Sequence, residues 1–258
     1  MKLAATDFDG TLYKADEICR ENIAAVQAWR AAGHKFGVIT GRDYGLLVPQ
    51  LRYFGIADDF AVCNNGAIIF DGAGRLLYQA EIKPDTVTAV ALHPCVKESL
   101  HVAFSQADRT CIYQEREGSW IFREARQWEF PLRIVEKDDI AQLQKVQQIA
   151  LGFASVEAAG DCAAKLNALF GESIHAYQNR ASVDITPPII SKSEGIKKLL
   201  ELMDWKRDSQ LYVIGDETND LPMIRQFQGY AIASAREEIR REAQQTFSTV
   251  GSMLRKFI

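Results

Sequence analysis

The chain has 258 residues, 47% of them hydrophobic and 25% charged, so it is long enough for one large domain or for a core with a second domain. Its formal net charge is −4 and no long basic block is present, which excludes a general nucleic-acid binder. No apolar stretch is long enough to span a membrane, and no hydrophobic signal segment precedes Asp7.

Short apolar runs alternate with amphipathic segments in the first and last parts of the chain. Such alternation predicts an α/β fold, with a parallel sheet covered by helices on both faces. In sheets of this kind, ligands bind beyond the carboxyl ends of the strands. We predict strands at residues 3–8, 36–39, 60–63 and 211–214, and helices at residues 20–32, 44–54 and 196–203.

The long middle of the chain predicts a second domain. About 150 positions separate Thr40 from Lys192, far more than one helix–strand unit needs. An insertion of roughly 100 residues, 83–184, therefore interrupts a sheet domain formed by residues 1–82 and 185–258. The insertion combines strand-like and helical segments, which indicates an α+β module. We predict its strands at residues 100–104, 110–113 and 182–185, and its helices at residues 140–151 and 162–170.

Two carboxylates lie two positions apart in the segment Asp7-Phe8-Asp9-Gly10-Thr11, at the end of the first apolar run. If the strand continues through them, Asp7 and Asp9 point to the same side. Carboxylates held so close repel each other unless a cation or a shared proton lies between them. Gly10 lets the chain turn immediately afterwards. This segment is typical of a magnesium site with one nucleophilic and one proton-transferring carboxylate.

Three further segments supply groups of the same kind. Thr40-Gly41-Arg42 follows the second apolar run, Lys192 precedes an amphipathic stretch, and residues 215–220, with the sequence Gly-Asp-Glu-Thr-Asn-Asp, follow another run. Taken singly, each is typical of an ordinary helix cap, surface lysine or turn. Together they favour one site, with a hydroxyl and an ammonium for phosphoryl oxygens and carboxylates for a hard cation.

These four segments, in this order, resemble the motifs of the haloacid dehalogenase (HAD) superfamily of aspartate-nucleophile phosphohydrolases. Asn65-Gly66-Ala67 and the exit Asp184-Ile185-Thr186-Pro187 further resemble subclass IIB, which contains the Cof-type phosphatases. The resemblance implies a Rossmann-like core, residues 1–82 and 185–258, and an inserted α+β cap of the C2B type, residues 83–184, that selects the substrate.

The resemblance also implies a role for each motif residue. Asp7 is the nucleophile that becomes a phosphoaspartate, Asp9 is the acid and base, and Thr40 and Lys192 complete the catalytic group. Mg²⁺ is held by Asp7, by the backbone carbonyl of Asp9 and by Asp216. The phosphate is bound by Thr11, Thr40, Gly41, Arg42, Lys192 and Asn219. Whether Arg42, Asn65 and Asp220 are functional or structural stays open.

The expected function is therefore a Mg²⁺-dependent phosphatase for small phosphorylated metabolites, with sugar phosphates the first choice. A phosphomutase of the same superfamily is the main alternative, because it uses the same first motif. A phosphoaspartate receiver domain of signalling proteins is a more distant one, since it lacks the second aspartate and the insertion. A non-catalytic phosphosugar-binding protein is disfavoured because every motif carboxylate is present.

Five cysteines, at positions 19, 63, 95, 111 and 162, are dispersed without CxxC spacing, and the four histidines show no paired spacing. This pattern favours reduced, packed thiols over a disulfide framework or a zinc site. We therefore expect a cytoplasmic protein, a monomer or weak homodimer, whose partner is a small phosphorylated metabolite and not nucleic acid or a membrane.

Overall fold

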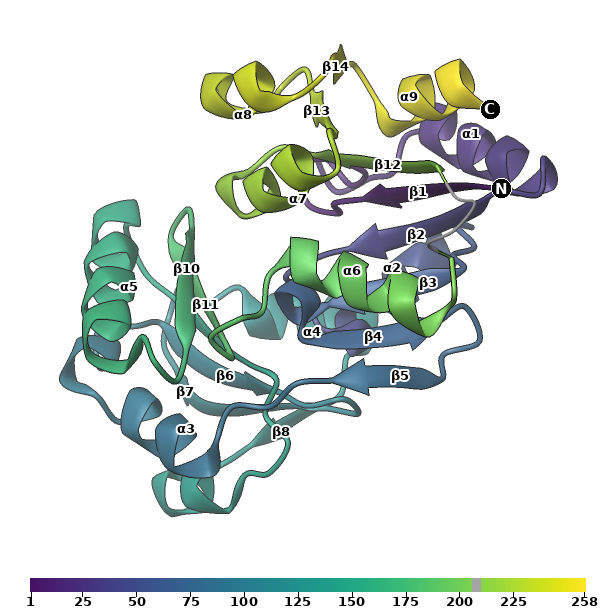
Figure 1. The fold of residues 1–258 in the computed structure, drawn as a ribbon. Helices are drawn as coiled ribbons and strands as arrows, with labels where there is room; N and C mark the ends of the chain where they lie inside the picture. The colour runs from purple at the N-terminus through teal and green to yellow at the C-terminus, as the bar shows by residue number, and fades with distance from the viewer. Residues whose placement is uncertain (206–209) are drawn as a thin grey trace. The chain divides into compact units, whose positions relative to one another are not determined.

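The computed structural model describes residues 1–205 and 210–258, which divide into two compact units (Figure 1). Unit 1 comprises Met1–Thr40, Gln50–Tyr78 and Ser191–Ile258, and unit 2 comprises Gly41–Pro49 and Gln79–Ile190. The predicted division placed the second unit at residues 83–184. The difference at its far end has a clear cause. Strand β11 (Ser182–Thr186) pairs along its length with strands of unit 2, so a boundary after Asp184 would cut it.

Within the described residues, unit 1 contains an eight-stranded sheet in the order β14-β13-β12-β1-β2-β3-β4-β5. The strands from β14 to β3 pair in parallel, and β4 is antiparallel to β3. The parallel α/β core expected from the alternating pattern is therefore confirmed. The strands are β1 (Lys2–Thr6), β2 (Lys35–Ile39), β3 (Phe60–Cys63), β4 (Ile68–Asp71), β5 (Leu76–Gln79), β12 (Gln210–Gly215), β13 (Tyr230–Ile232) and β14 (Thr246–Phe247).

Helices cover both faces of this sheet. Ile196 and Leu199 of α6 and Met223 of α7 join one buried cluster with strand residues such as Val213. On the opposite face, Tyr212 contacts Trp29 of α1 and Phe257 of α9. Figure 1 shows α6 and α7 together on one side and α1 beside α9 on the other. The helices are α1 (Arg20–Ala31), α2 (Tyr44–Tyr53), α6 (Lys192–Leu202), α7 (Leu221–Gln226), α8 (Glu237–Glu242) and α9 (Val250–Phe257).

Strand β1 is shorter than the predicted strand at residues 3–8. It ends at Thr6, and the Phe8 carbonyl accepts the backbone N–H groups of Leu12 and Tyr13 at 3.0 and 2.8 Å. The chain therefore turns directly after Asp7. The strand-alternation argument for Asp7 and Asp9 therefore does not apply beyond Thr6, and Asp7 is buried whereas Asp9 is exposed.

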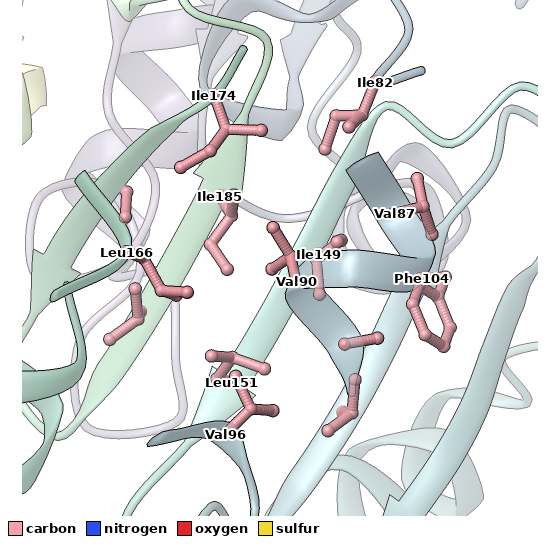
Figure 2. Close-up of a cluster of buried hydrophobic side chains, with 14 of the residues drawn as sticks. Ile82, Val87, Val90, Val96, Phe104, Ile149, Leu151, Leu166, Ile174 and Ile185 are labelled. Carbon is pink, nitrogen blue, oxygen red and sulfur yellow. The ribbon is translucent and has the colours of Figure 1, made fainter. Parts of the chain in front are cut away.

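Unit 2 contains a six-stranded, mostly antiparallel sheet in the order β10-β11-β9-β6-β7-β8, in which only the β7–β8 pair is parallel among the described pairs. Helices α3 and α5 pack on one face through the cluster of Figure 2, which includes Val87, Val90 and Leu166. Helix α4 packs on the other face through Ile121. The elements are α3 (Pro84–Ala91), β6 (His101–Ser105), β7 (Thr110–Glu115), α4 (Ile121–Trp128), β8 (Leu132–Ile134), β9 (Gln148–Gly152), α5 (Val156–Phe170), β10 (His175–Asn179) and β11.

One predicted element of unit 2 is wrong. The helix expected at residues 140–151 is a 3-10 turn, Lys137–Gln142, followed by strand β9. Lys145 has a left-handed backbone with φ of 56°, which an α-helix does not accommodate. Ile149 and Leu151 face the large cluster, whereas Ala150 faces α4, so this segment has the period of a strand.

The described helices include none that combines the length and the apolar character that crossing a membrane requires.

His101 of β6 is a fully buried titratable group in unit 2. Its Nδ1 lies 3.1 Å from Ser119 Oγ, and its ring meets Trp120 edge-on at 5.2 Å between centroids. A Cβ atom on Gly152 would lie 2.3 Å from the ring, so only glycine leaves room for it on the neighbouring strand. Burial lowers the pKa of His101 from 6.5 to about 4.

The free energy of unfolding of unit 2 is therefore expected to decrease as the pH is lowered. Below pH 6.5 His101 takes up a proton in the unfolded chain, whereas in the folded unit it stays neutral down to about pH 4. The free energy of unfolding therefore decreases as the pH falls from 6.5 to 4. Between pH 7 and pH 5 the expected loss is about 2 kcal/mol, measured by hydrogen exchange of β6 and β9 amides, and His101→Gln should remove it.

Buried carboxylates such as Asp43, whose pKa burial raises to about 6, act in the opposite direction but equally in both proteins. The difference between wild type and variant therefore isolates His101. An equal loss of stability in the two proteins would contradict this assignment.

Candidate active site

Three neighbouring parallel strands of unit 1 end at one edge of the sheet. Thr6 of β1 pairs with Ile214 of β12 on one side and with Val38 of β2 on the other. Asp7, Thr40 and Asp216 follow these strands closely in the sequence, so the register brings them to the same edge. The Asp7 N–H also donates to the Ile214 carbonyl at 2.9 Å, which continues the alignment one residue beyond the strand.

A buried ion-pair chain forms the centre of this edge. The Lys192 Nζ donates to Asp7 Oδ1 and to Asp220 Oδ1, each at 2.6 Å. Lys192 lies at the first position of α6, directly after the cap formed by Ser191, whose hydroxyl accepts the Glu194 N–H at 3.1 Å. The helix start therefore fixes where the ammonium enters the site.

Asp216 is held by a hydroxyl group. Thr11 Oγ1 donates to Asp216 Oδ1 at 2.7 Å, and a Cβ atom on Gly10 would lie 2.3 Å from the other carboxylate oxygen. Gly10 also has φ of 81°, so glycine is required both for the turn and for the close approach of Asp216. The Thr11 hydroxyl proton is therefore directed to Asp216, and its predicted phosphate contact stays a prediction.

Asp220 accepts three hydrogen bonds from within the protein. Its Oδ2 accepts the backbone N–H groups of Asp216 and Glu217 at 2.9 and 3.0 Å, while Oδ1 accepts Lys192. A Cβ atom on Gly215 would lie 2.4 Å from the Asp220 carboxyl carbon, so this loop closes only around glycine. Asp220, a residue of undecided role in the sequence, therefore anchors Lys192 and the loop that carries Asp216.

The carboxylates of the site shift one another's ionisation. Burial raises the pKa of Asp7 well above its usual value, the Lys192 ammonium lowers it, and the neighbouring Asp220 and Asp216 raise it again. Burial likewise raises the pKa of Asp216, against the hydrogen bond from Thr11. Burial alone would lower the pKa of Lys192, but Asp220 and Asp7 outweigh it and hold the pKa above its usual value.

The donor set fits a hard divalent cation. Asp7, Asp216 and Asp220 each offer an oxygen, and these oxygens lie within 4.8 Å of one another, which is the one such group in residues 1–205 and 210–258. One ammonium faces three carboxylates there, so the buried site carries excess negative charge that a cation would offset. Because Asp220 already accepts three hydrogen bonds, Asp7 and Asp216 are the residues better placed to hold the ion.

Two asparagines extend the site toward β3. Asn219 Nδ2 donates to Asn65 Oδ1 at 3.1 Å, and the Asn65 N–H donates to the Thr40 carbonyl at 2.9 Å. Within the described residues, the buried Asn219 Oδ1 has no hydrogen-bond partner. Asn64 and Asn65 both have left-handed backbones. The Asn-Asn-Gly sequence after β3 is the signal of this turn, and sequence reasoning left the role of Asn65 open.

The remaining predicted residues are divided between the two units or differ in burial. The division between the units runs between Thr40 and Gly41, so Thr40 belongs to unit 1 and Gly41 and Arg42 belong to unit 2. The Arg42 guanidinium forms an ion pair there with Glu124 at 3.4 Å. Asp9 is exposed and its carboxylate is not part of the buried group.

Known proteins resemble this chain over nearly its whole length. A family model described as haloacid dehalogenase-like hydrolase matches residues 4–251. The 5-amino-6-(5-phospho-D-ribitylamino)uracil phosphatase YbjI of Escherichia coli is 25% identical over 244 residues, which cover 88% of this chain and 82% of that protein.

Two solved structures share the fold. The HAD subclass IIB sugar phosphatase BT4131 superposes with a TM-score of 0.80 at 22% identity, covering 100% of this chain and 99% of that one. A HAD/COF-like hydrolase from Plasmodium vivax superposes with a TM-score of 0.84 at 19% identity, covering 99% and 95%. Because one family model accounts for almost every residue from β1 to α9, this chain belongs to the haloacid dehalogenase-like hydrolases.

Proposed function

We propose that the protein is a Mg²⁺-dependent phosphatase that hydrolyses small phosphorylated metabolites, sugar phosphates above all, through a phosphoaspartate on Asp7. The observation that carries this proposal is the buried chain Asp7–Lys192–Asp220 at the carboxyl edge of the sheet, beside Asp216. Burying charged groups beside one another costs free energy of folding, so such an arrangement indicates a catalytic use. Phosphate-monoester hydrolysis is among the slowest uncatalysed reactions, and a firmly held carboxylate beside a cation site would accelerate it.

In the first step, a carboxylate oxygen of Asp7 attacks phosphorus. A new P–O bond forms, the ester P–O bond breaks, and Asp9 gives its proton to the departing oxygen. The two aspartates suit different roles because their surroundings differ: Asp7 is buried against Lys192, whereas Asp9 is exposed and can exchange protons with water.

In the second step, water attacks phosphorus of the phosphoaspartate. Asp9 now accepts a proton from that water, the bond between Asp7 and phosphorus breaks, and inorganic phosphate and free Asp7 result. The same pair of residues therefore serves both half-reactions.

The ammonium of Lys192 binds and orients the transferred group. It has three N–H bonds, of which two go to Asp7 and Asp220, so the third is available to a phosphoryl oxygen. Thr40 lies at the neighbouring strand end and is the predicted hydroxyl partner of that group. Mg²⁺ held by Asp7 and Asp216 would offset the charge of the two anions that must meet.

The names of two similar proteins support the substrate class. One is a phosphatase of a phosphorylated ribityl compound and the other a sugar phosphatase, so both act on phosphate esters of polyhydroxylated small molecules. We assign the choice among such esters to unit 2, as the cap inserted into the core. The free thiols of all five cysteines support a reducing cytoplasm, where we place the protein as a monomer or weak homodimer.

A phosphomutase is the alternative with the same chemistry on Asp7. It would return the phosphoryl group to a sugar hydroxyl and would need a bisphosphate activator. Steady release of inorganic phosphate from a sugar phosphate without such an activator favours the phosphatase, and conversion to a phosphate isomer without release would reject it. A signalling receiver domain is disfavoured because it has neither the counterpart of Asp9 nor a second unit.

Replacing the nucleophile should abolish turnover. Asp7→Asn should reduce kcat at least ~10³-fold with the fold unchanged by circular dichroism, because an amide oxygen does not form the acyl phosphate. Mass spectrometry of rapidly quenched wild type should find phosphate on Asp7. The matched control is Asp9→Asn with p-nitrophenyl phosphate, whose leaving group needs no proton: phosphoenzyme should accumulate. Phosphate release by Asp7→Asn above a few per cent of wild type would rule out the mechanism.

Removing the cation should stop hydrolysis, and Asp216 and Thr11 should set its affinity. Excess chelator should abolish activity and Mg²⁺ should restore it. Direct titration with Mn²⁺ as a spectroscopic probe should show Asp216→Asn binding at least ~10-fold more weakly, and Thr11→Val, which removes only the supporting hydrogen bond, ~10-fold or less. Unchanged Mn²⁺ affinity in Asp216→Asn would show that this carboxylate is not a ligand.

Exposed arginines of α4 should affect substrate choice but not the chemistry. Arg123→Ala and Arg126→Ala should change kcat/KM by ~10-fold or more for some sugar phosphates and little for p-nitrophenyl phosphate. Arg109→Ala and Arg116→Ala are matched controls, since those guanidinium groups are held by Asp108 and by the Lys97 carbonyl. Equal losses on every ester would contradict the assignment of specificity to unit 2.

A further inference from the structure

Two cysteines far apart in the sequence meet inside unit 2. Cys95 lies in the short 3-10 turn Pro94–Val96, and Cys162 lies in α5. The Cys162 thiol donates to Cys95 Sγ at 3.4 Å, although 67 positions separate the two residues. The other three cysteines take no part in this contact. The pair is therefore a dithiol that tertiary packing creates and that the dispersed spacing of the cysteines hides.

His93 forms the other side of this pair. Its Nδ1 accepts the Cys95 backbone N–H at 3.3 Å and lies 3.0 Å from Cys95 Sγ. Because Nδ1 accepts that backbone proton, it carries the single lone pair of the neutral ring, which the Cys95 N–H and the Cys95 thiol share, so proton transfer from the thiol replaces the backbone hydrogen bond. The result is a chain of hydrogen bonds from Cys162 to Cys95 to His93, in which the proton of Cys95 has an acceptor and its sulfur has a donor.

The two thiols differ in a way that assigns their roles. Cys162 is buried, and burial together with the contact to Cys95 raises the pKa of its thiol. Cys95 is partly exposed and lines a surface pocket of about 480 Å³ together with His93, Cys162 and Lys165. A thiolate at Cys95 would be stabilised by an imidazolium on one side and an S–H donor on the other, and a small molecule in the pocket can reach it.

We propose that Cys95 and Cys162 form a redox modification site that reacts with hydroperoxides and closes to an intramolecular disulfide. Proton transfer from Cys95 to His93 gives the thiolate, which attacks a peroxide oxygen. The S–O bond forms, the O–O bond breaks, and the departing oxygen takes the proton from His93, so that Cys95 becomes a sulfenic acid and an alcohol or water leaves.

Cys162 then resolves the sulfenic acid. Its sulfur attacks Cys95 Sγ, the S–S bond forms, the S–O bond breaks, and hydroxide leaves with the Cys162 proton as water. Two thiols and one hydroperoxide thus give one disulfide, one alcohol or water, and one water, and the two electrons lost by sulfur reduce the peroxide. In a reducing compartment a disulfide of this kind is transient and is reopened by small thiols.

A metal site is the competing explanation of the same residues. Zinc needs three or four ligands close together, and among the described residues these cysteines and His93 do not form a group with the mutual spacing that a metal ion requires. The pocket beside the dithiol is also lined by the carboxylates of Glu98, Glu157 and Asp161, by Lys165, and by Pro94, Phe153, Ser155 and Ala158. The structure therefore favours the dithiol reaction.

The experiment uses the full-length reduced protein and hydrogen peroxide as the probe. After quenching with an alkylating reagent, peptide mass spectrometry should find the Cys95 and Cys162 peptides joined, with a mass lower by two hydrogens, and dithiothreitol should reverse it. Cys162→Ser should instead retain a sulfenic acid on Cys95 that dimedone traps. Cys95→Ser should leave Cys162 unoxidised. His93→Asn keeps the backbone acceptor but not the base, and should slow the reaction ~10-fold near neutral pH.

Cys111→Ser is the matched control, since Cys111 is a buried thiol of the same unit and should not affect the cross-link. The wild-type peptide map needs no variant to fold, so the proposal is tested even if a substitution destabilises unit 2. Absence of the Cys95–Cys162 peptide in excess peroxide would overturn the proposal. So would an unchanged rate and pH profile in His93→Asn, or stoichiometric Zn²⁺ binding that both cysteine variants abolish.

Discussion

The burial of one ammonium group between two carboxylates is the constraint on which the core of this protein depends. Lys192 is 2% exposed and Asp220 is fully buried, so neither charge can be compensated by water. Removing one member of such a chain leaves an uncompensated buried charge, which costs about 3–5 kcal/mol. The start of α6, the end of β1 and the loop after β12 must therefore meet in one arrangement, and that arrangement is the candidate active site.

The same constraint explains which backbone positions must be glycine. Asp220 reaches Lys192 only by folding back over its own loop, where Gly215 leaves the space for its carboxyl group. Asp216 is thereby turned toward Asp7, and Gly10 leaves the space for it on the facing turn. Like charges accumulate as a result, since three carboxylates share one ammonium. A divalent cation would relieve that repulsion. The same cation would therefore serve both the stability of the site and the proposed reaction.

Unit 2 follows a different logic. Its antiparallel sheet is stabilised by an apolar cluster with α3 and α5 (Figure 2). The environment of its buried polar groups follows from that packing. His101 stays neutral because the sheet buries it, and the sulfurs of Cys95 and Cys162 meet because α5 packs beside the turn at Pro94. In this unit, tertiary packing brings the thiols of Cys95 and Cys162 together, and the spacing of these residues in the sequence does not predict the contact.

The sequence by itself determined the parallel core, because strand–helix alternation is a local pattern, and its acidic strand ends predicted that Asp7 and Asp216 would lie near each other. It could not determine that β1 stops at Thr6, that Thr11 serves Asp216, or that residues 148–152 form a strand. Those outcomes depend on partners distant along the chain. The hydroxyl of Thr11 donates its one proton to Asp216, which lies 205 positions away. Residues 148–152 form strand β9 because β11 and β6 pair with it on either side. Only the tertiary structure decides such pairings, since a hydrogen bond or a packed face is a property of two segments and not of one.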